Sequence, residues 1–231
     1  MNMLDDIMNR ASEALARTDY LTCEARCLDA LALARDEEEW DYYARILLPL
    51  QEARRQRRII ASEAGVRLGS ASLTGRPQDW LERHDAGCFL LTRPHTAETA
   101  SNLASLAWSE ELYVEVLFAD SRAEGDTWTV LATAGPAVTC ELPAPPPAWR
   151  DRWLPAGEVP EPEAGSPLPP GEAPVDWFID ATEKLGDAAI AQVTAPLGSP
   201  ERVDQLSRML DVVTDHEQLH QRLGEAARAL R

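Results

Sequence analysis

Residues 14–35 read ALARTDYLTCEARCLDALALAR. On both sides of a polar break at Thr18 and Asp19, small and apolar side chains recur every three or four positions, which is the period of an α-helix. Asp19 stands immediately before the second apolar series, where an aspartate can accept hydrogen bonds from the free N–H groups of a first helical turn. The segment therefore predicts two helices joined by a short turn.

The helical pattern extends outward over residues 2–66. The first helix carries one apolar stripe, made of Met3, Leu4, Ile7, Met8, Ala11, Ala14 and Leu15. The acidic run 36–39 suits the first turn of a third helix, because carboxylates are favoured at the positive end of the helix dipole. Pro49 lacks a backbone N–H and is expected to kink or end that helix, which then resumes over 51–64.

Residues 3–64 resemble tetratricopeptide repeats. The resemblance rests on the Asp19-Tyr20 pair and on small or apolar residues at repeat spacing, namely Cys23, Cys27, Ala30 and Leu31. About 33 residues after Ile7 a second unit begins in the same pattern, with Trp40, Tyr43, Ala44 and Leu47.

The resemblance implies antiparallel helical hairpins in a protein that binds other proteins. The chain departs from the repeat pattern in two ways: the first helix lacks its usual glycine, and Pro49 interrupts the second unit. Such repeats need about three copies to bury a core, and about one and a half are present. We therefore expect these helices to pack on the rest of the chain or on another subunit.

The middle of the chain has a different pattern. Residues 67–86 are predicted to be a connection because they begin in a segment rich in glycine and serine. Residues 87–142 predict the order strand, helix, strand, strand, strand, in which 112–118 alternates apolar and polar side chains. The expected fold class is α+β, with the N-terminal helical hairpins, a small and mainly antiparallel sheet with one helix, and C-terminal helices.

Residues 143–174 are predicted to be a proline-rich linker. We expect no helix or strand over 155–173, because proline and glycine favour extended, solvated backbone. Trp149 and Trp153 indicate that the linker is held against the rest of the protein at that point. Residues 175–231 predict two helices, the second opened by Ser199 as N-cap and Pro200 as first helical residue. The expected organisation is therefore 1–66, 67–86, 87–142, 143–174 and 175–231.

Composition limits the location and the partners. The chain has 39 acidic and 22 basic residues, a net charge of −17. Because this field repels phosphate backbones, no nucleic-acid partner is expected. No run approaches the roughly 18 apolar residues of a membrane span, and no secretory signal is evident, so we expect no membrane and a cytoplasmic location. The cysteines are then expected to be reduced, and they are Cys23, Cys27, Cys88 and Cys140.

The motif with the most definite chemistry is His216-Glu217-Gln218-Leu219-His220, which matches H-E-x-x-H. In zinc peptidases with this motif the two histidines bind one metal and the glutamate activates a water molecule. A catalytic zinc needs a third protein ligand, and no histidine follows His220. The alternative is that both histidines lie at a helix interface, which we favour, so no metal or other cofactor is expected.

A basic cluster lies in the run EARRQRR, where it comprises Arg54, Arg55, Arg57 and Arg58. It is the candidate binding site of the chain, because arginines can bind a phosphate, an acidic peptide or an anionic face of a partner. The alternatives are a solvated helix face and arginines neutralised by the protein's own carboxylates. Cys23 and Cys27, four apart on one helix, could bind a metal, although packing as small apolar residues explains them better.

Two hypotheses about function follow. The first is a protein–protein interaction or scaffold protein, whose partner is another protein or a second copy of the chain. The second is a metal-dependent hydrolase that uses His216, Glu217 and His220. Tightly bound zinc would favour the second.

Overall fold

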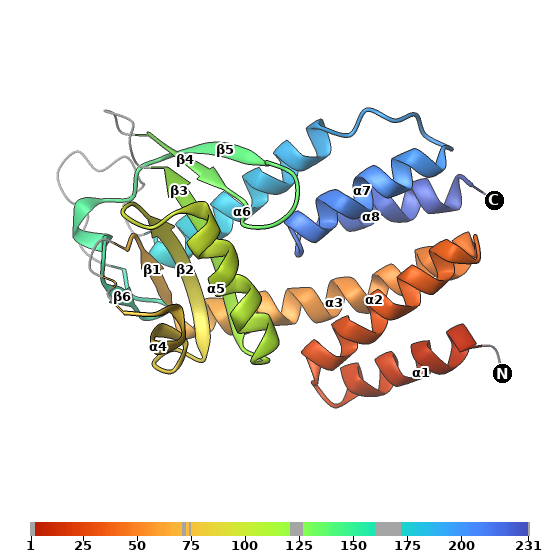
Figure 1. Cartoon of the computed structure of the whole chain (residues 1–231), viewed down its shortest axis with the longest axis horizontal. Helices are drawn as coiled ribbons and strands as arrows, with labels where there is room; N and C mark the ends of the chain where they lie inside the picture. The colour runs from red at the N-terminus through yellow and green to blue at the C-terminus, as the bar shows by residue number, and fades with distance from the viewer. Residues whose placement is uncertain (1–2, 71–72, 74, 121–126, 160–171, 231) are drawn as a thin grey trace. The chain divides into compact units, whose positions relative to one another are not determined.

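The structure is a computed structural model that describes residues 3–70, 73, 75–120, 127–159 and 172–230 (Figure 1). The chain divides into two compact units. One consists of residues 1–57 and 189–231 and is called the helical unit. The other consists of residues 58–188 and is called the sheet unit. The helical unit is thus built from both ends of the chain.

The helical unit contains α1 (Met3–Ala16), α2 (Tyr20–Asp36) and the first part of α3 (Trp40–Ala64). It is completed by α7 (Pro200–Val212) and α8 (Glu217–Arg228). The three N-terminal helices, which are too few to bury a core by themselves, therefore pack on the rest of the chain. Their contacts use small residues that are fully buried, namely Ala11, Cys23, Cys27, Ala30 and Ala53.

The junctions between α1, α2 and α3 are left-handed turns without glycine. Thr18 has φ 61° and Glu38 has φ 57°. At the first junction Asp19 N donates to Ala14 O at 2.9 Å, and Thr18 N donates to Leu15 O at 3.0 Å, which is the hydrogen-bond pattern of a Schellman motif. The side chain of Asp19 then accepts from Thr22 N, so the predicted N-cap of α2 is confirmed.

The third helix does not end at Pro49, which was one of the two outcomes expected there. α3 runs without interruption from Trp40 to Ala64. A proline inside a helix costs about 3 kcal/mol, but the residues on either side of it, Ile46 and Leu50, are fully buried and stabilise the helix. The acidic run 36–39 also lies elsewhere than expected, because Asp36 ends α2 and residues 37–39 form the turn before α3.

The sheet unit contains one mixed sheet with the strand order β5-β4-β3-β2-β1-β6. Its strands are β1 (Val66–Leu68), β2 (Ala86–Thr92), β3 (Tyr113–Asp120), β4 (Thr127–Leu131), β5 (Thr139–Pro143) and β6 (Trp153–Leu154). The α+β class is confirmed. The pairs β1–β2 and β2–β3 are parallel and the other three pairs are antiparallel. The central pairs are parallel because α4 (Pro77–Leu81) and α5 (Ala97–Ser109) return the chain between those strands.

Helices cover both faces of this sheet (Figure 1). α4 and α5 bury Trp80 and Leu103 against Phe89 and Leu91 of β2. On the other side α6 (Pro174–Ala191) anchors the end of β5, since Trp177 Nε1 donates to Pro143 O at 2.9 Å. No helix in the described ranges is both long and apolar enough to cross a membrane.

The predicted linker contributes to the sheet unit. Trp149 lies in a short helix (Pro147–Trp149) and is buried, and β6 pairs with β1, so the expected attachment at Trp149 and Trp153 is confirmed. Gly87 allows this attachment, because a Cβ there would lie 2.2 Å from Trp153 Cη2. Residues 155–159 and 172–173 form no helix or strand, and the rest of the segment expected to be irregular lies outside the described residues.

Candidate functional site: a buried ion-pair centre and a cleft in the helical unit

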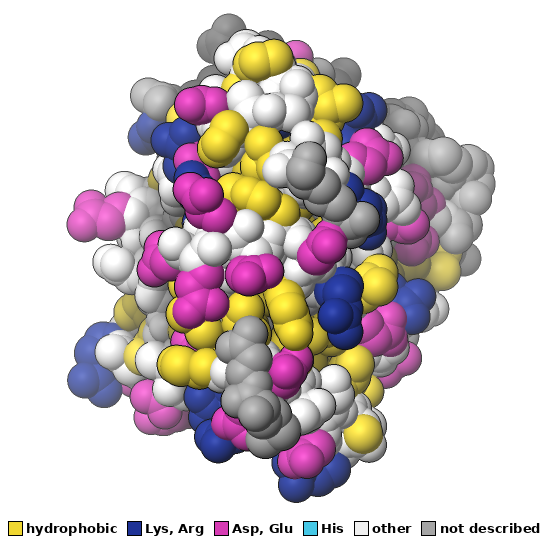
Figure 2. Space-filling model, turned by 90° about the vertical axis from the view of Figure 1, so that its right-hand side faces the viewer, with side chains coloured by type: hydrophobic (Ala, Val, Ile, Leu, Met, Phe, Trp, Pro, Cys, Tyr) yellow, Lys and Arg dark blue, Asp and Glu magenta, His cyan; other side chains and the backbone are white. Residues whose placement is uncertain are grey.

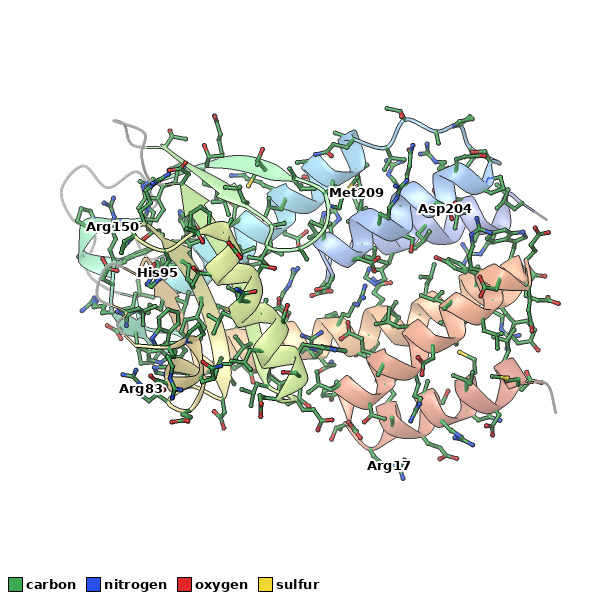
Figure 3. All side chains as sticks on the ribbon, viewed as in Figure 1. Arg17, Arg83, His95, Arg150, Asp204 and Met209 are labelled. Atoms are coloured by element: carbon green, nitrogen blue, oxygen red, sulfur yellow. The ribbon has the colours of Figure 1, made fainter. Side chains whose placement is uncertain are left out.

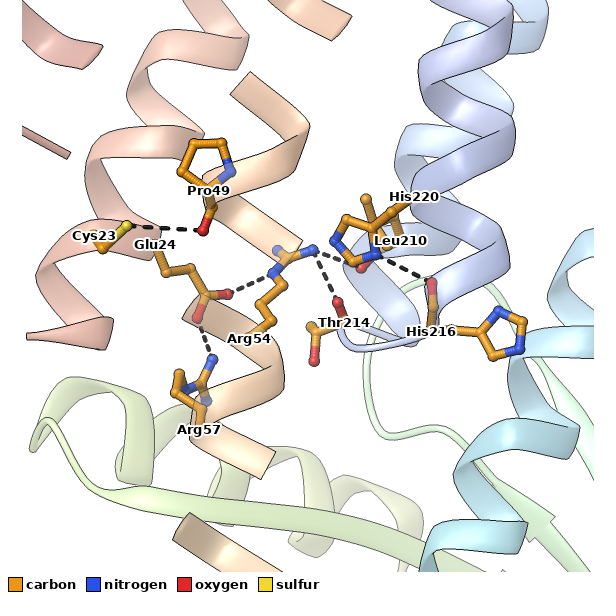
Figure 4. Close-up of polar contacts among 9 residues, drawn as sticks. All are labelled: Cys23, Glu24, Pro49, Arg54, Arg57, Leu210, Thr214, His216 and His220. Carbon is orange, nitrogen blue, oxygen red and sulfur yellow. Dashed lines mark hydrogen bonds and ion pairs between the residues drawn. The ribbon is translucent and has the colours of Figure 1, made fainter. Parts of the chain in front are cut away.

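The predicted arginine cluster meets a carboxylate inside the helical unit (Figure 4). Glu24 of α2 is 2% exposed, and its Oε1 accepts from Arg54 Nε at 2.8 Å. Its second oxygen, Oε2, accepts from Arg57 Nη1. Arg54 and Arg57 lie three positions apart, so both face α2 from one side of α3. We call these three residues the ion-pair centre.

Arg54 also binds the C-terminal end of α7. Its Nη1 donates to Leu210 O and to Thr214 O, each at 3.3 Å. The last carbonyls of a helix have no partner within it, and they carry the negative end of its dipole. Arg54 therefore caps α7 and, through Glu24, connects α7 to α2 (Figure 4).

The charges of the centre stabilise one another. Burial alone would raise the pKa of Glu24, but the charges of Arg54 and Arg57 outweigh it, and the pKa lies below its usual value. Glu24 is therefore ionised, and removing it would take the compensating carboxylate away from both buried guanidinium groups.

The other two arginines have different surroundings. Arg58 belongs to the sheet unit, where its Nη1 donates to Glu183 Oε1 at 2.8 Å. Arg55 is 59% exposed and pairs with Glu52 one turn away. All four arginines thus contact carboxylates of the chain, as one of the alternatives left open by the sequence expected. A binding role for the cluster stays a prediction, and Arg55 is the member that a partner could reach.

The two histidines of the H-E-x-x-H match do not share a helix. α8 begins at Glu217, and His216 is its N-cap, whose Nδ1 accepts from Leu219 N at 3.3 Å. His220 Nδ1 lies 3.1 Å from His216 O, and the two imidazole rings point away from each other (Figure 4). The single helix expected after Ser199 is therefore wrong, because α7 ends at Val212 and the chain turns before α8.

Both histidines are buried, each 2% exposed. Burial, and then the charge of Arg54, lower the pKa of His220 to about 4, so its ring is neutral at pH 7. Its Nε2 has no hydrogen-bond partner within the described part of the chain. Over that same part, no three histidine, cysteine, aspartate or glutamate side chains are grouped so that they could hold a metal.

Cys23 and Cys27 pack inside the helical unit. Both are fully buried, and Cys23 Sγ lies 3.9 Å from Pro49 O. The hydrogen bond with Cys23, followed by burial, raises the pKa of the Cys27 thiol. Cys27 therefore stays protonated at neutral pH, which fits packing better than metal binding.

A cleft of about 230 Å³ opens on the helical unit between α2, α3, α7 and α8. We call it the α2–α7 cleft. Its apolar lining consists of Leu28, Leu31, Ala32, Leu50, Leu210 and Leu223. Arg54 reaches it from the ion-pair centre, and Tyr43 lines it and hydrogen bonds with Ser207 of α7.

An ion pair stands at the rim of the α2–α7 cleft. Arg35 Nε and Nη2 donate to the two carboxylate oxygens of Asp204 at 2.8 and 3.0 Å. Asp204, labelled in Figure 3, belongs to α7. The Arg35 guanidinium also lies over the ring of Trp40, 5.1 Å from its centroid. The pair joins α2 to α7 beside the cleft.

Sequence reasoning missed Glu24, which organises the ion-pair centre. Glu24, Cys27 and Leu31 lie on one face of α2, so a carboxylate there occurs within a stripe of buried residues. This position in a buried stripe was the sequence signal for an ion pair at Glu24, because a buried carboxylate needs a cationic partner. The α2–α7 cleft had no sequence signal, since four helices from both ends of the chain form it.

Comparison with known proteins adds no relative. No protein-family model matches the chain, and no curated protein or solved structure is significantly similar to it. The resemblance of residues 3–64 to tetratricopeptide repeats therefore stays a prediction.

Proposed function

We propose that this chain is a protein-binding protein and that its helical unit carries the binding surface. The observation that supports this most is the α2–α7 cleft, in which apolar side chains lie beside charged ones such as Arg35, Asp204 and Asp211. Specific protein interfaces combine these features, because an apolar side chain of one partner fills a pocket of the other inside a polar rim.

The arrangement of the helices supports the same proposal. α7 and α8 complete a unit that the N-terminal hairpins begin, and Arg54 joins α2, α3 and α7 from within. A surface held by such contacts keeps its shape before a partner arrives, which lowers the entropy cost of binding. The resemblance to tetratricopeptide repeats points to protein binding as well, as an analogy of fold.

The experiment is cross-linking of the full chain in its own cells, followed by reconstitution with the purified partner. Saturable binding with a fixed stoichiometry would support the proposal. Sedimentation of the chain alone tests the second kind of partner, which is another copy of itself. A chain that stays monomeric and forms no reproducible cross-link would contradict the proposal.

The geometry gives the metal-dependent hydrolase no comparable support. His216 uses Nδ1 as the cap of α8, and its ring points away from that of His220 (Figure 4). A catalytic zinc requires converging ligands and an open position for water. Protein binding is therefore the function that we carry forward.

A further inference from the structure

We infer that the α2–α7 cleft receives an apolar side chain from a basic, amphipathic segment of a partner protein. The inference rests on the proposed function and adds the place of contact and the chemistry of the partner. It combines the shape and apolar lining of the cleft with the charge of the neighbouring turn.

The cleft has room for one side chain of medium size. Its volume is about 230 Å³, and the leucines that line it come from α2, α3, α7 and α8. Leu50, Leu210 and Leu223 are almost fully buried by their neighbours, so they form a fixed surface. Ala32 lines the cleft as well and is exposed, which leaves the approach from solvent open.

The turn between α2 and α3 makes the surroundings of the cleft acidic. Five exposed carboxylates occur within six positions, and they are Asp36, Glu37, Glu38, Glu39 and Asp41. Figure 2 shows the end of the molecule where α2 meets α3, with hydrophobic side chains exposed among acidic and basic ones.

The acidic turn is adjacent to the cleft. Arg35 lines the cleft, and the charge of Glu38 acts on it. Arg35 Nε and Nη2 already donate to Asp204, so Arg35 shares its charge between that carboxylate and the turn. A segment with lysine or arginine around an apolar anchor complements this distribution, whereas an acidic segment is repelled.

A second copy of the chain fits the site less well than a basic partner. The net charge of −17 makes two copies repel each other, so self-association through the acidic turn is disfavoured. The cleft also indicates that the partner segment is amphipathic. Its apolar side chain enters the cleft, while basic side chains on the flanking helical turns reach the carboxylates of the acidic turn.

The test uses a fluorescent peptide and the full chain. The peptide has about 18 residues, with leucine every three or four positions and lysine elsewhere, so that it forms a basic amphipathic helix. One matched peptide replaces lysine by glutamate, and another replaces leucine by alanine. We expect saturable binding of the leucine–lysine peptide, with affinity lower by about tenfold or more for each matched peptide.

Two pairs of variants locate the contact. Ala32→Trp fills the cleft from an exposed position, and Ala16→Trp adds the same side chain at the exposed end of α1. The first variant should weaken peptide binding by about tenfold and the second by less than about twofold. A triple variant with Asp36→Asn, Glu37→Gln and Glu39→Gln should bind the peptide more weakly and with a smaller salt dependence. The control is a triple variant that removes the same charge at Glu13, Glu217 and Glu225, and it should show neither change.

The inference is overturned if Ala32→Trp binds the leucine–lysine peptide as tightly as Ala16→Trp, or if the glutamate peptide binds as well as the lysine one. Equal loss of affinity in the two groups of charge variants also overturns it. A partner found by cross-linking that binds Ala32→Trp normally leaves the proposed function in place and removes the cleft as its site. Circular dichroism of each variant confirms that the helices are retained.

Discussion

Arg54 Nε lies 2.8 Å from Glu24 Oε1, and neither side chain is more than 3% exposed. Thirty positions separate the two residues in the chain. The same guanidinium binds the carbonyls of Leu210 and Thr214, more than 150 positions further on. One side chain thus joins the N-terminal hairpins to the C-terminal helices, so the stability of the helical unit should depend on it.

Glu24→Gln is expected to destabilise the protein by about 3–5 kcal/mol, because it removes the carboxylate that Arg54 and Arg57 both contact. Urea unfolding followed by circular dichroism measures the change. Arg55→Met, in the same helix but exposed, is the control and should change the free energy of unfolding by less than about 0.5 kcal/mol. Similar losses in the two variants would show that the ion-pair centre has no special role.

His220 should make the protein less stable as the pH falls. The unfolded chain binds this proton near pH 6.5, whereas the folded chain binds it only near pH 4. The contribution of His220 to the free energy of unfolding is therefore fully present above pH 6.5 and is lost as the pH falls to 4. The loss totals about 3 kcal/mol, at about 1.36 kcal/mol for each unit of pKa.

The measurement is the free energy of unfolding of His220→Gln and of the parent protein between pH 7 and pH 4. The variant should lose less stability over this range, because its amide does not titrate. Gln221→Ala, at the next and exposed position, is the control that keeps the full pH dependence. If the free energy of unfolding of His220→Gln falls with pH as steeply as that of the parent protein, another group causes the pH dependence.

Glycine in the left-handed turns should stabilise the helical hairpins. Thr18 and Glu38 both have positive φ, which costs a residue with a Cβ about 1–2 kcal/mol. Part of this is offset by the greater freedom of glycine in the unfolded chain. We expect Thr18→Gly and Glu38→Gly each to raise stability by about 0.5–1 kcal/mol.

Thermal unfolding compares these variants with Ser12→Gly, which lies inside α1 and is exposed. That control should lose about 1 kcal/mol, because glycine in a helix interior is unfavourable. A loss of stability in Thr18→Gly as large as in Ser12→Gly would contradict the left-handed geometry of the turn.

Gly87→Ala should disrupt the packing of Trp153 on the sheet. Its Cβ would lie 2.2 Å from the indole, and its φ is 145°, so we expect a loss of about 3 kcal/mol or more. Gly157→Ala is the control, since φ is 76° there and no atom lies within 4 Å of the new Cβ. The control should lose only about 1 kcal/mol. Trp153→Ala in the Gly87→Ala background should recover part of the loss, and its failure to do so would remove this contact as the cause.

Elemental analysis of the purified protein should find far less than one zinc per chain. His216 Nδ1 caps α8, and the ring of His220 points elsewhere, so the two do not converge on one ion. His216→Ala should cost about 1 kcal/mol of stability as a lost N-cap. Zinc that copurifies one to one and is absent from His220→Ala would contradict this and favour the hydrolase.

Local sequence signals were enough for most of the helices and for the longer strands of the sheet unit. Asp19 and Ser199 cap the helices that they were expected to cap. Alternation predicted β3, and apolar runs predicted β2 and the following strands. These features depend on residues within about four positions of each other, which periodicity and capping rules describe.

The short strands could not be predicted in this way. β1 has three residues and β6 has two, so neither is long enough to show a period. They are strands because they pair, β1 with β2 and with β6. Pro49 shows the same effect in a helix, where burial of the neighbouring side chains outweighs the local preference for a break.

The amino-acid sequence by itself determined most of the helices, the caps at Asp19 and Ser199, the α+β class and the presence of an arginine cluster on one helix. Only the tertiary structure decided that Arg54 and Arg57 face inward to Glu24, that His216 is the N-cap of α8 and does not lie within a helix with His220, and that a cleft opens between α2 and α7. Each of these depends on segments far apart in the chain. A residue's neighbours in sequence set its backbone conformation, but the charge that it meets is set by whichever helix packs against it.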